Sequence, residues 1–209
     1  ANLYLHELDR YMESTYLNLD HHARERRRKQ GKFNFLYVRY ADDFVVFCNG
    51  SKAEALAMKD ELKGVLSNMG LTLSEEKTKV THITDGFDFL GYRIIRSIGT
   101  KGKLVTKVLT PAEAIKQFQY KVRGMLGPST TNESMSARII ALNRLIRGWC
   151  EYYRSTSSPQ WGFEEVTQKL FWGMAHWLGK KYKVSIPTVF QRYRKGNTFG
   201  TKSTTLVMP

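Results

Sequence analysis

Apolar residues recur with two different periods along this chain of 209 residues. Up to about residue 110, short runs rich in aromatic and β-branched residues surround one clear helical pattern, whereas beyond Pro111 apolar positions recur about every 3.6 residues. The short period is typical of strands and the long one of helices. We therefore predict an α+β chain with a first domain at 1–110, a helical domain at 111–183 and a basic C-terminal tail at 184–209.

The first domain is expected to contain helices and two β-hairpins. The predicted elements are a helix at 2–19, a hairpin at 33–48, a capped helix at 51–69, a short strand at 71–73 and a second hairpin formed by 87–98 and 103–109. Ser51 and Glu54 have the spacing of a capping box. The run 33–48 is apolar except around residues 41–43, so these are predicted to form a tight turn.

Beyond Pro111, three apolar stripes at helical spacing predict a three-helix bundle. Basic residues outside the stripes should form its exterior; they are Lys116, Lys121, Arg123, Arg138, Arg144, Arg147 and Arg154. Trp149 and Tyr153 are assigned to the core, whereas Tyr152 and Trp161 fit either a core or a base-stacking position. The end of the chain, 195–209, is rich in Gly, Thr, Ser and Lys, and is expected to be loosely ordered.

The charge balance adds a partner to this picture. Lys and Arg number 33 against 19 acids, a formal net charge of +14, which favours a polyanionic partner over an inert basic surface. The basic segment 21–32 is either a solvated helix end or an arm that faces nucleic acid. No apolar run is long enough to span a membrane, and no targeting peptide is recognisable. Cys48 and Cys150 lack metal-ligand spacing and are expected to be buried, reduced thiols.

The sharpest chemical signal is Tyr40-Ala41-Asp42-Asp43 at the predicted hairpin tip. Adjacent carboxylates repel each other unless a cation compensates them, and oxygen ligands suit Mg²⁺, which completes its shell with waters and substrate phosphates. Two such ions about 3.5 to 4 Å apart serve nucleotidyl transfer. The alternative is an ordinary turn, because Asp favours turns for local reasons. The apolar flanks favour the metal site.

Several stretches resemble, in order, parts of the group II intron reverse transcriptases. YVRYADDFVVF resembles the catalytic hairpin, with the Ala typical of group II enzymes, and ANLYLHELDRYM resembles the palm helix before it. LGYRI resembles the primer grip, LTLSEEKTKV the segment preceding it, and LNRLIRGWCEYYR the thumb, called domain X in maturases. The resemblance covers about residues 1–180. It implies a partial palm of antiparallel hairpins with packed helices, followed by a three-helix thumb.

The resemblance also implies roles for individual residues. Asp42 and Asp43 would be the catalytic metal ligands, and Lys77 would lie near the incoming nucleotide, where a surface lysine is the alternative. Substrate-binding positions would be Tyr40 and Ala41 beside the primer end and Phe89, Leu90, Gly91 and Tyr92 in the primer grip. Nucleic-acid contacts in the thumb would come from Arg123, Arg138, Arg144, Arg147 and Arg154.

The implied activity is RNA-directed DNA synthesis with Mg²⁺, an RNA template, a DNA or RNA primer and dNTPs, together with binding of intron RNA to assist splicing. A palm aspartate and the fingers are expected from an upstream segment, so the chain alone is predicted not to extend a primer. The alternatives are a non-catalytic RNA-binding maturase module and the reverse transcriptase of a defence or CRISPR-associated system. The expected location is the bacterial cytoplasm, associated with nucleoid or RNA, with an organelle as the alternative.

Overall fold

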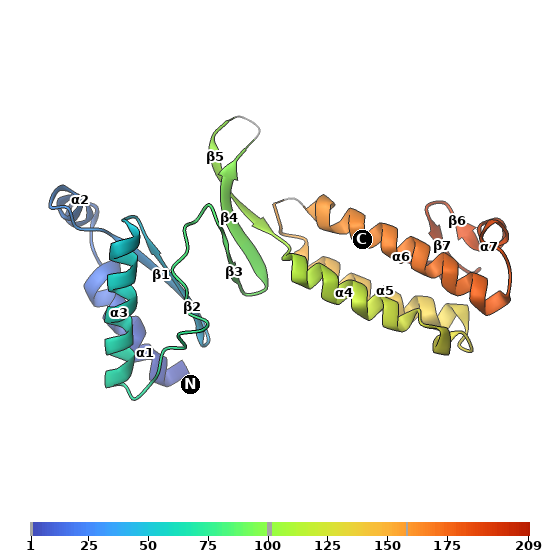
Figure 1. Cartoon of the computed structure of the whole chain (residues 1–209), viewed down its shortest axis with the longest axis horizontal. Coiled ribbons are helices and arrows are strands. Elements are labelled where there is room, and N and C mark those ends of the chain that lie inside the picture. The colour runs from blue at the N-terminus through green and yellow to red at the C-terminus, as the bar shows by residue number, and fades with distance from the viewer. Residues whose placement is uncertain (1, 100–101, 158) are drawn as a thin grey trace. The chain divides into compact units, whose positions relative to one another are not determined.

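The computed structural model describes residues 2–99, 102–157 and 159–209 (Figure 1). Helices are mixed with small antiparallel sheets, as the α+β prediction requires. The chain divides into two compact units, Ala1–Leu90 and Gly91–Pro209. Each unit has a hydrophobic core of its own.

The first unit packs helices against one face of a two-stranded hairpin. Its elements are α1 (Asn2–Met12), a π-helical turn (Glu13–Leu17), α2 (His21–Lys29), β1 (Phe35–Tyr40), β2 (Asp43–Cys48), α3 (Lys52–Asn68) and β3 (Phe87–Phe89). Leu8 and Met12 on α1 meet Met58 and Leu62 on α3 in the core. Ser51 and Glu54 form the expected capping box at the start of α3. The predicted first helix, hairpin and capped helix are therefore confirmed in kind.

The short strand predicted at 71–73 is wrong. These residues have no regular secondary structure. Leu73 is buried and packs into the first core together with Leu66. Alternating apolar residues here serve packing against α3, and the sheets among the described residues contain no strand that pairs with this segment.

The second unit joins a hairpin to a group of helices. Its elements are β4 (Tyr92–Ile98), β5 (Leu104–Leu109), α4 (Ala112–Met125), a 3₁₀ turn (Pro128–Thr130), α5 (Met135–Tyr153), α6 (Pro159–Tyr182), α7 (Ile186–Tyr193), β6 (Arg194–Lys195) and β7 (Thr198–Phe199). In Figure 1, α4 runs beside both α5 and α6. Ile139 and Leu142 on α5 and Leu170 and Met174 on α6 are fully buried in this core. The predicted second hairpin is confirmed for β4 and β5, whereas the predicted strand at 87–98 is divided into β3 and β4.

The boundary between the compact units differs from the predicted domain boundary near residue 110. Two contacts explain the difference. The Tyr92 hydroxyl donates to the backbone carbonyl of Tyr152, and the Val108 amide donates to the Ser157 hydroxyl oxygen at 2.8 Å. Both bonds attach the β4–β5 hairpin to the C-terminal end of α5, so the hairpin belongs to the helical unit.

The prediction of a loosely ordered tail at 195–209 is also wrong. Phe199 and Leu206 are 0% and 2% exposed and belong to the second core. Asn143 on α5 accepts a hydrogen bond from the Val207 amide at 2.8 Å. The polar composition of the segment suggested disorder. Instead, its two buried apolar side chains and its hydrogen bond to Asn143 hold it against the helices.

Two simpler expectations can be compared directly. In the described part of the chain, every helix is too short or too polar to cross a bilayer. Cys48 and Cys150 are free and only partly buried, so they are unpaired as predicted although less enclosed than expected. Burial raises the pKa of the Cys150 thiol.

Candidate functional site

The hairpin tip is a two-residue turn. Tyr40 pairs with Asp43 across the strands, which leaves Ala41 and Asp42 as the loop. Ala41 has φ +53°, a left-handed conformation that is uncommon outside glycine. A positive φ at the first loop residue is typical of type II′ turns, whose twist matches that of a hairpin. The strained alanine thus allows β2 to begin directly with the second carboxylate.

The two carboxylates are open to a ligand. Asp42 and Asp43 are exposed, and within the described residues their side chains make no hydrogen bond or ion pair. By the strand register, Asp43 shares a face with Tyr40, Val38 and Val45. Tyr40 is 67% exposed and Val38 is 43% exposed, so this face of the hairpin is largely uncovered. The arrangement meets the first requirement of a metal site, which is unneutralised charge in reach of solvent.

The opposite face of the hairpin holds the positive charge. Arg39 donates to both carboxylate oxygens of Asp9 at 2.8 and 2.5 Å, and the Tyr37 hydroxyl donates to the same carboxylate at 3.1 Å. The Arg39 hydrogen bonds lower the pKa of Asp9, whereas burial raises the pKa of Tyr37. Arg39 also donates to the Ala41 carbonyl at 2.7 Å. This guanidinium therefore braces the turn and is bonded on the face away from Asp43.

Replacing Asp9 with Asn should lower the free energy of unfolding at pH 7 by about 1 to 2 kcal/mol, because it leaves a mostly buried arginine without its counter-charge. The folded state lowers the pKa of Asp9 below 3.8, so its contribution is present above that value and is lost as the pH falls through the lowered pKa. Denaturant unfolding at pH 7 and near pH 3 measures both effects. Glu7→Gln on the same helix is the control, since its pair with Arg10 is exposed. Equal destabilisation by both changes would contradict this account.

Two carboxylates alone suit Mg²⁺ only if waters and substrate phosphates complete its shell. Among the described residues, the group of at least three side chains with ligand atoms in mutual reach is His21, His22 and Glu25, and it does not include the turn acids. Its nitrogen ligands suit other metals. Glu25 is moreover paired with Lys29 at 3.2 Å. The donor chemistry at the turn fits Mg²⁺, with ligands still to come from outside these residues.

Lys77 is exposed in a turn at 75–77, and no hydrogen bond or ion pair within the described residues joins it to the turn acids. The neighbouring Glu75 is held by α3: Lys59 and Lys63 each lie 2.8 Å from its carboxylate. These two ammonium groups lower the pKa of Glu75 to about 2. The segment that carries Lys77 is thus anchored, while Lys77 itself has no hydrogen bond or ion pair within the described residues.

The four residues predicted as the primer grip lie on a second tight turn. Phe89 ends β3, Leu90 and Gly91 both have positive φ, and Tyr92 begins β4. In the second unit, the Gly91 carbonyl accepts a hydrogen bond from Tyr153 at 3.2 Å. The rings of Tyr92 and Tyr152 stack, with centroids 5.2 Å apart.

Two tyrosines of α5 therefore hold this turn. Tyr153 is buried, and Trp149 packs against the hydrophobic core of the second unit, so both core assignments are confirmed. Tyr152 is 50% exposed and stacks on Tyr92 of the turn, so it is not a core residue, and its base-stacking assignment stays a prediction. The side chain of Trp161 lies outside the described part of the structure.

Replacing Gly91 with Ala should destabilise the fold by about 1 to 2 kcal/mol. Its φ of +72° disfavours a side chain, and an added Cβ would lie 3.0 Å from the Tyr152 hydroxyl. Gly148→Ala in α5 is the matched control, with nothing within 4 Å of its Cβ, and should stabilise by about 0.5 to 1 kcal/mol. Urea unfolding of both variants decides the point. A neutral effect at Gly91 would mean that the turn relaxes freely.

The arginines predicted to contact nucleic acid are not equivalent. Four of the five predicted nucleic-acid contacts are exposed; they are Arg123, Arg144, Arg147 and Arg154. Arg138 is 6% exposed and paired with Glu133, so its assignment to the basic exterior is wrong. The periodicity missed this because Arg138 lies next to the α5 N-terminus, where an acid just before the helix can pair with it.

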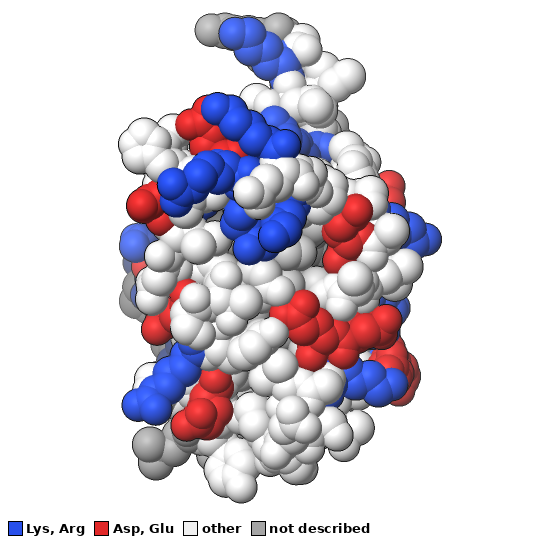
Figure 2. Space-filling view, turned by 90° about the vertical axis from the view of Figure 1, so that its left-hand side faces the viewer, with Lys and Arg blue, Asp and Glu red and all other residues white. Residues whose placement is uncertain are grey.

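The basic segment 21–32 is a surface helix, α2, capped by Asp20 and without buried residues. Figure 2 shows the side of the molecule that lies at the left in Figure 1, and Lys and Arg gather towards its upper end, where α2 lies. Arg24 donates to the Leu17 carbonyl at 2.9 Å and Arg27 to the Phe33 carbonyl at 3.1 Å. Two of its arginines thus fasten the helix, and the others face solvent.

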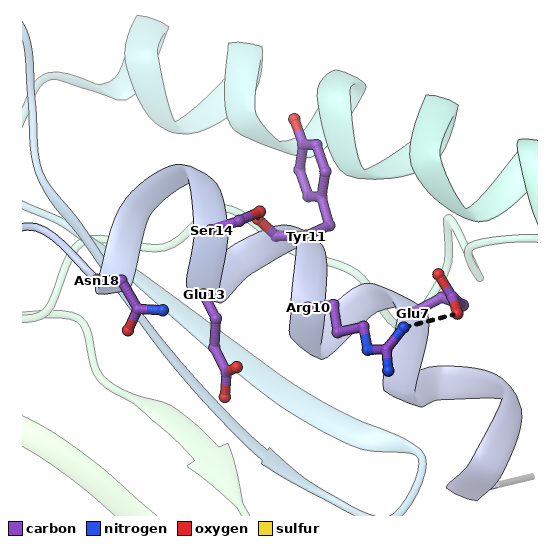
Figure 3. Close-up of a pocket in the computed structure, with 6 residues that line it drawn as sticks. All are labelled: Glu7, Arg10, Tyr11, Glu13, Ser14 and Asn18. Atoms are coloured by element: carbon purple, nitrogen blue, oxygen red, sulfur yellow. Dashed lines mark hydrogen bonds and ion pairs between the residues drawn. The ribbon is translucent and has the colours of Figure 1, made fainter.

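A shallow hollow of about 540 Å³ lies on the outer side of α1 (Figure 3). Glu7 and Arg10 form an ion pair of 3.9 Å in its lining. Tyr11 points towards α3, where its hydroxyl donates to Glu61. Burial raises the pKa of Tyr16, which donates to Glu61 as well, at 2.6 Å. None of the lining residues is a turn acid, and the hollow is the outer surface of a packed helix.

Comparison with known proteins agrees with this geometry. Residues 1–94 match the family described as Reverse transcriptase (RNA-dependent DNA polymerase), and residues 115–195 match the Group II intron, maturase-specific domain. The first match contains the carboxylate turn. The second contains α5 and α6 with their exposed basic residues.

Individual relatives are consistent with the two domains. Protein YkfC of Escherichia coli (strain K12) is 34% identical over 142 residues, 60% of this chain and 37% of that protein. Group II intron-encoded protein LtrA of Lactococcus lactis subsp. cremoris is 32% identical over 146 residues, 58% of this chain and 24% of LtrA. The Putative COX1/OXI3 intron 1 protein of Saccharomyces cerevisiae is 31% identical over 140 residues, 62% of this chain and 15% of that protein.

The chain spans well under half the length of each of these relatives. The two domain matches follow each other along the chain in the order in which the carboxylate hairpin and the basic helices occur. On these grounds, the chain is similar to the group II intron reverse transcriptases and maturases: its first part matches the reverse transcriptase family and its second part the maturase-specific domain.

Proposed function

We propose that the chain forms part of an RNA-directed DNA polymerase of group II intron type that also binds intron RNA to assist splicing. The observation that carries the proposal is the pair Asp42 and Asp43, exposed and unpaired at the tip of a strained two-residue turn. An ordinary surface turn does not need two adjacent acids beside an apolar face. The match to the reverse transcriptase family supplies the reaction class in which such a pair is used.

The turn residues take distinct roles in this proposal. Asp42 and Asp43 hold Mg²⁺, which when bound stabilises the charge that develops on the transferred phosphoryl group and on the departing pyrophosphate. Tyr40 and Ala41 lie beside the primer end, where the small alanine leaves room for the nascent base pair. Lys77, exposed and unpaired, neutralises charge on the incoming dNTP. Arg39 positions the turn through its bond to the Ala41 carbonyl.

The second unit contributes the hold on the primer. The backbone at Gly91 approaches the primer strand, while Tyr152 and Tyr153 keep its turn in place. Phe89 and Leu90 complete the grip from the β3 side. The helices α4, α5 and α6 act as a thumb, with the exposed arginines along the phosphate backbone.

The proposal is tested by primer extension. The chain joined to an upstream segment with fingers and a further palm aspartate should copy an RNA template into DNA when Mg²⁺ and dNTPs are present. The chain alone should not extend the primer. Extension by the chain alone would contradict the expected need for an upstream segment. Failure of the joined protein to extend, with RNA binding retained, would favour the RNA-binding module instead.

That second candidate, a non-catalytic RNA-binding module, is favoured by the net charge of +14. Both candidates require binding to a phosphate backbone, so RNA affinity should fall steeply with salt. Four neutralised phosphates correspond to a loss on the order of a hundredfold between about 50 and 200 mM salt. Electrophoretic mobility shifts across this range measure it. An affinity independent of salt would contradict RNA binding in either form.

A further inference from the structure

A groove of about 340 Å³ runs between α4 and α6 of the second unit. This is within the range of about 300 to 1,000 Å³ that is usual for ligand sites. Its floor is apolar and includes Val122, Leu170 and Trp177, which are all buried. An added Cβ at Gly173 would lie 3.1 Å from Leu126, so the missing side chain lets the two helices approach at the base of the groove.

Trp172 lines the groove and is 50% exposed. Its ring is supported on other sides by Phe171, with centroids 5.7 Å apart and an edge-on angle of 89°, and by Phe190 at 6.0 Å. His176 lies one turn further along α6, 6.3 Å from the indole. A large aromatic ring that is held in place and still half open to solvent is a ready stacking surface.

The rim of the groove is positively charged. Arg123, Lys169 and Lys180 line it, and none of its lining residues is acidic. Lys169 is already bonded to Glu165 at 2.8 Å. Arg123 and Lys180 are exposed and have no hydrogen bond or ion pair within the described residues. Two cations are thus available in the lining of the groove that also holds the indole.

Spacing along α6 places these features in line. Trp172, His176 and Lys180 are four residues apart, so they follow one face of the helix over about 12 Å. Arg123 faces the same groove from α4. An aromatic platform between separated cations matches a single strand, in which an unpaired base stacks while neighbouring phosphates pair with basic groups.

We propose that the α4–α6 groove binds single-stranded RNA, with one unpaired base stacked on Trp172 and the flanking phosphates paired with Arg123 and Lys180. The inference rests on the proposed function for its RNA partner and adds to it a site and a strand type. A duplex keeps its bases stacked inside, so no base face is free to lie on the indole. An acidic peptide would pair with the cations but would have no base to stack on the indole.

The test measures binding of a short fluorescein-labelled oligouridylate to the whole chain by anisotropy, with affinities compared at about 100 mM salt and the salt slope measured from about 50 to 200 mM. Trp172→Ala should weaken binding on the order of tenfold, and Trp172→Phe should retain most of it. Arg123→Gln and Lys180→Gln should each weaken binding and reduce the salt slope by about one. Tyr120→Ala on α4, an aromatic that is 77% exposed and does not line the groove, is the matched control.

Three results would contradict the binding of single-stranded RNA in this groove. One is a single-strand affinity unchanged by Trp172→Ala in a variant that unfolds like the parent chain. Another is an equal loss on duplex RNA of the same length. The third is competition by polyglutamate as effective as that by unlabelled oligouridylate. If the parent chain binds no RNA at all, both the proposed function and the proposed RNA site in the groove are contradicted. Salt-dependent binding that is unaffected by Trp172→Ala contradicts the groove site alone.

Discussion

Replacing Asp42 with Asn should lower the rate of cDNA synthesis by the joined protein about a thousandfold. Metal ions supply several kcal/mol of transition-state stabilisation in such reactions, and about 1.4 kcal/mol corresponds to a tenfold change in rate. The amide keeps the size of the side chain and loses the charge that holds Mg²⁺. Single-turnover primer extension measures the effect without interference from product release.

Asp60→Asn is the matched control, because Asp60 is exposed on α3 in the same unit and is not part of the turn. It should leave extension unchanged. The Asp42 variant should unfold like the parent chain, since its side chain makes no contact to lose within the described residues. RNA affinity should also persist. A variant that keeps more than about a tenth of the parent rate would contradict the proposal that Asp42 is a metal ligand.

Replacing Trp177 with Ala should destabilise the chain by about 3 to 5 kcal/mol, the usual effect of deleting a buried tryptophan. The side chain is 1% exposed, and its indole nitrogen donates to the Thr130 hydroxyl at 2.9 Å. The change therefore opens a cavity and removes the hydrogen bond that the Thr130 hydroxyl accepts, while this hydroxyl still donates to the Gly127 carbonyl at 2.7 Å. Denaturant unfolding of the chain measures it.

Trp172→Ala on the same helix separates burial from residue type. Trp172 is half exposed, so its loss should change the free energy of unfolding by at most about 1 kcal/mol. Comparable effects at both positions would mean that the groove is part of the core. The comparison also checks that the variant used for RNA binding remains folded.

Local signals predicted the parts of the fold that local physics determines. The run around the adjacent acids gave a hairpin because its apolar flanks and tight turn leave few other structures. The helix after Ser51 has its capping box, and the hairpin up to Leu109 formed as its β-branched residues suggested. Each of these depends on neighbours within a few residues.

Predictions failed where contacts that the hydrophobic periodicity does not encode decide the outcome. Arg138 was assigned to the surface, yet Glu133 and the packed start of α5 bury it. Leu73 was placed in a strand that has no partner among the described residues. Trp172 was overlooked because it lies between the apolar stripe positions 170 and 174. A tryptophan off the stripe of an amphipathic helix was the available signal.

The candidate site was predictable only as residue types. The acids of the turn could be read from the chain, but their freedom from counter-charge depends on Arg39 being occupied by Asp9 on the opposite face. Likewise, the Gly91 turn depends on tyrosines about 60 residues further along the chain. Such long-range pairings have no signature in a single sequence.

The folded C-terminal segment has a practical consequence for expression of the maturase-specific region. The family match ends at residue 195, whereas Phe199 and Leu206 fill the same core as Val189. A recombinant domain trimmed to the matched boundary would lose both side chains and expose the hydrophobic surface that they cover, which favours aggregation. Boundaries drawn from family matches should therefore be extended past Leu206 before such a domain is judged insoluble.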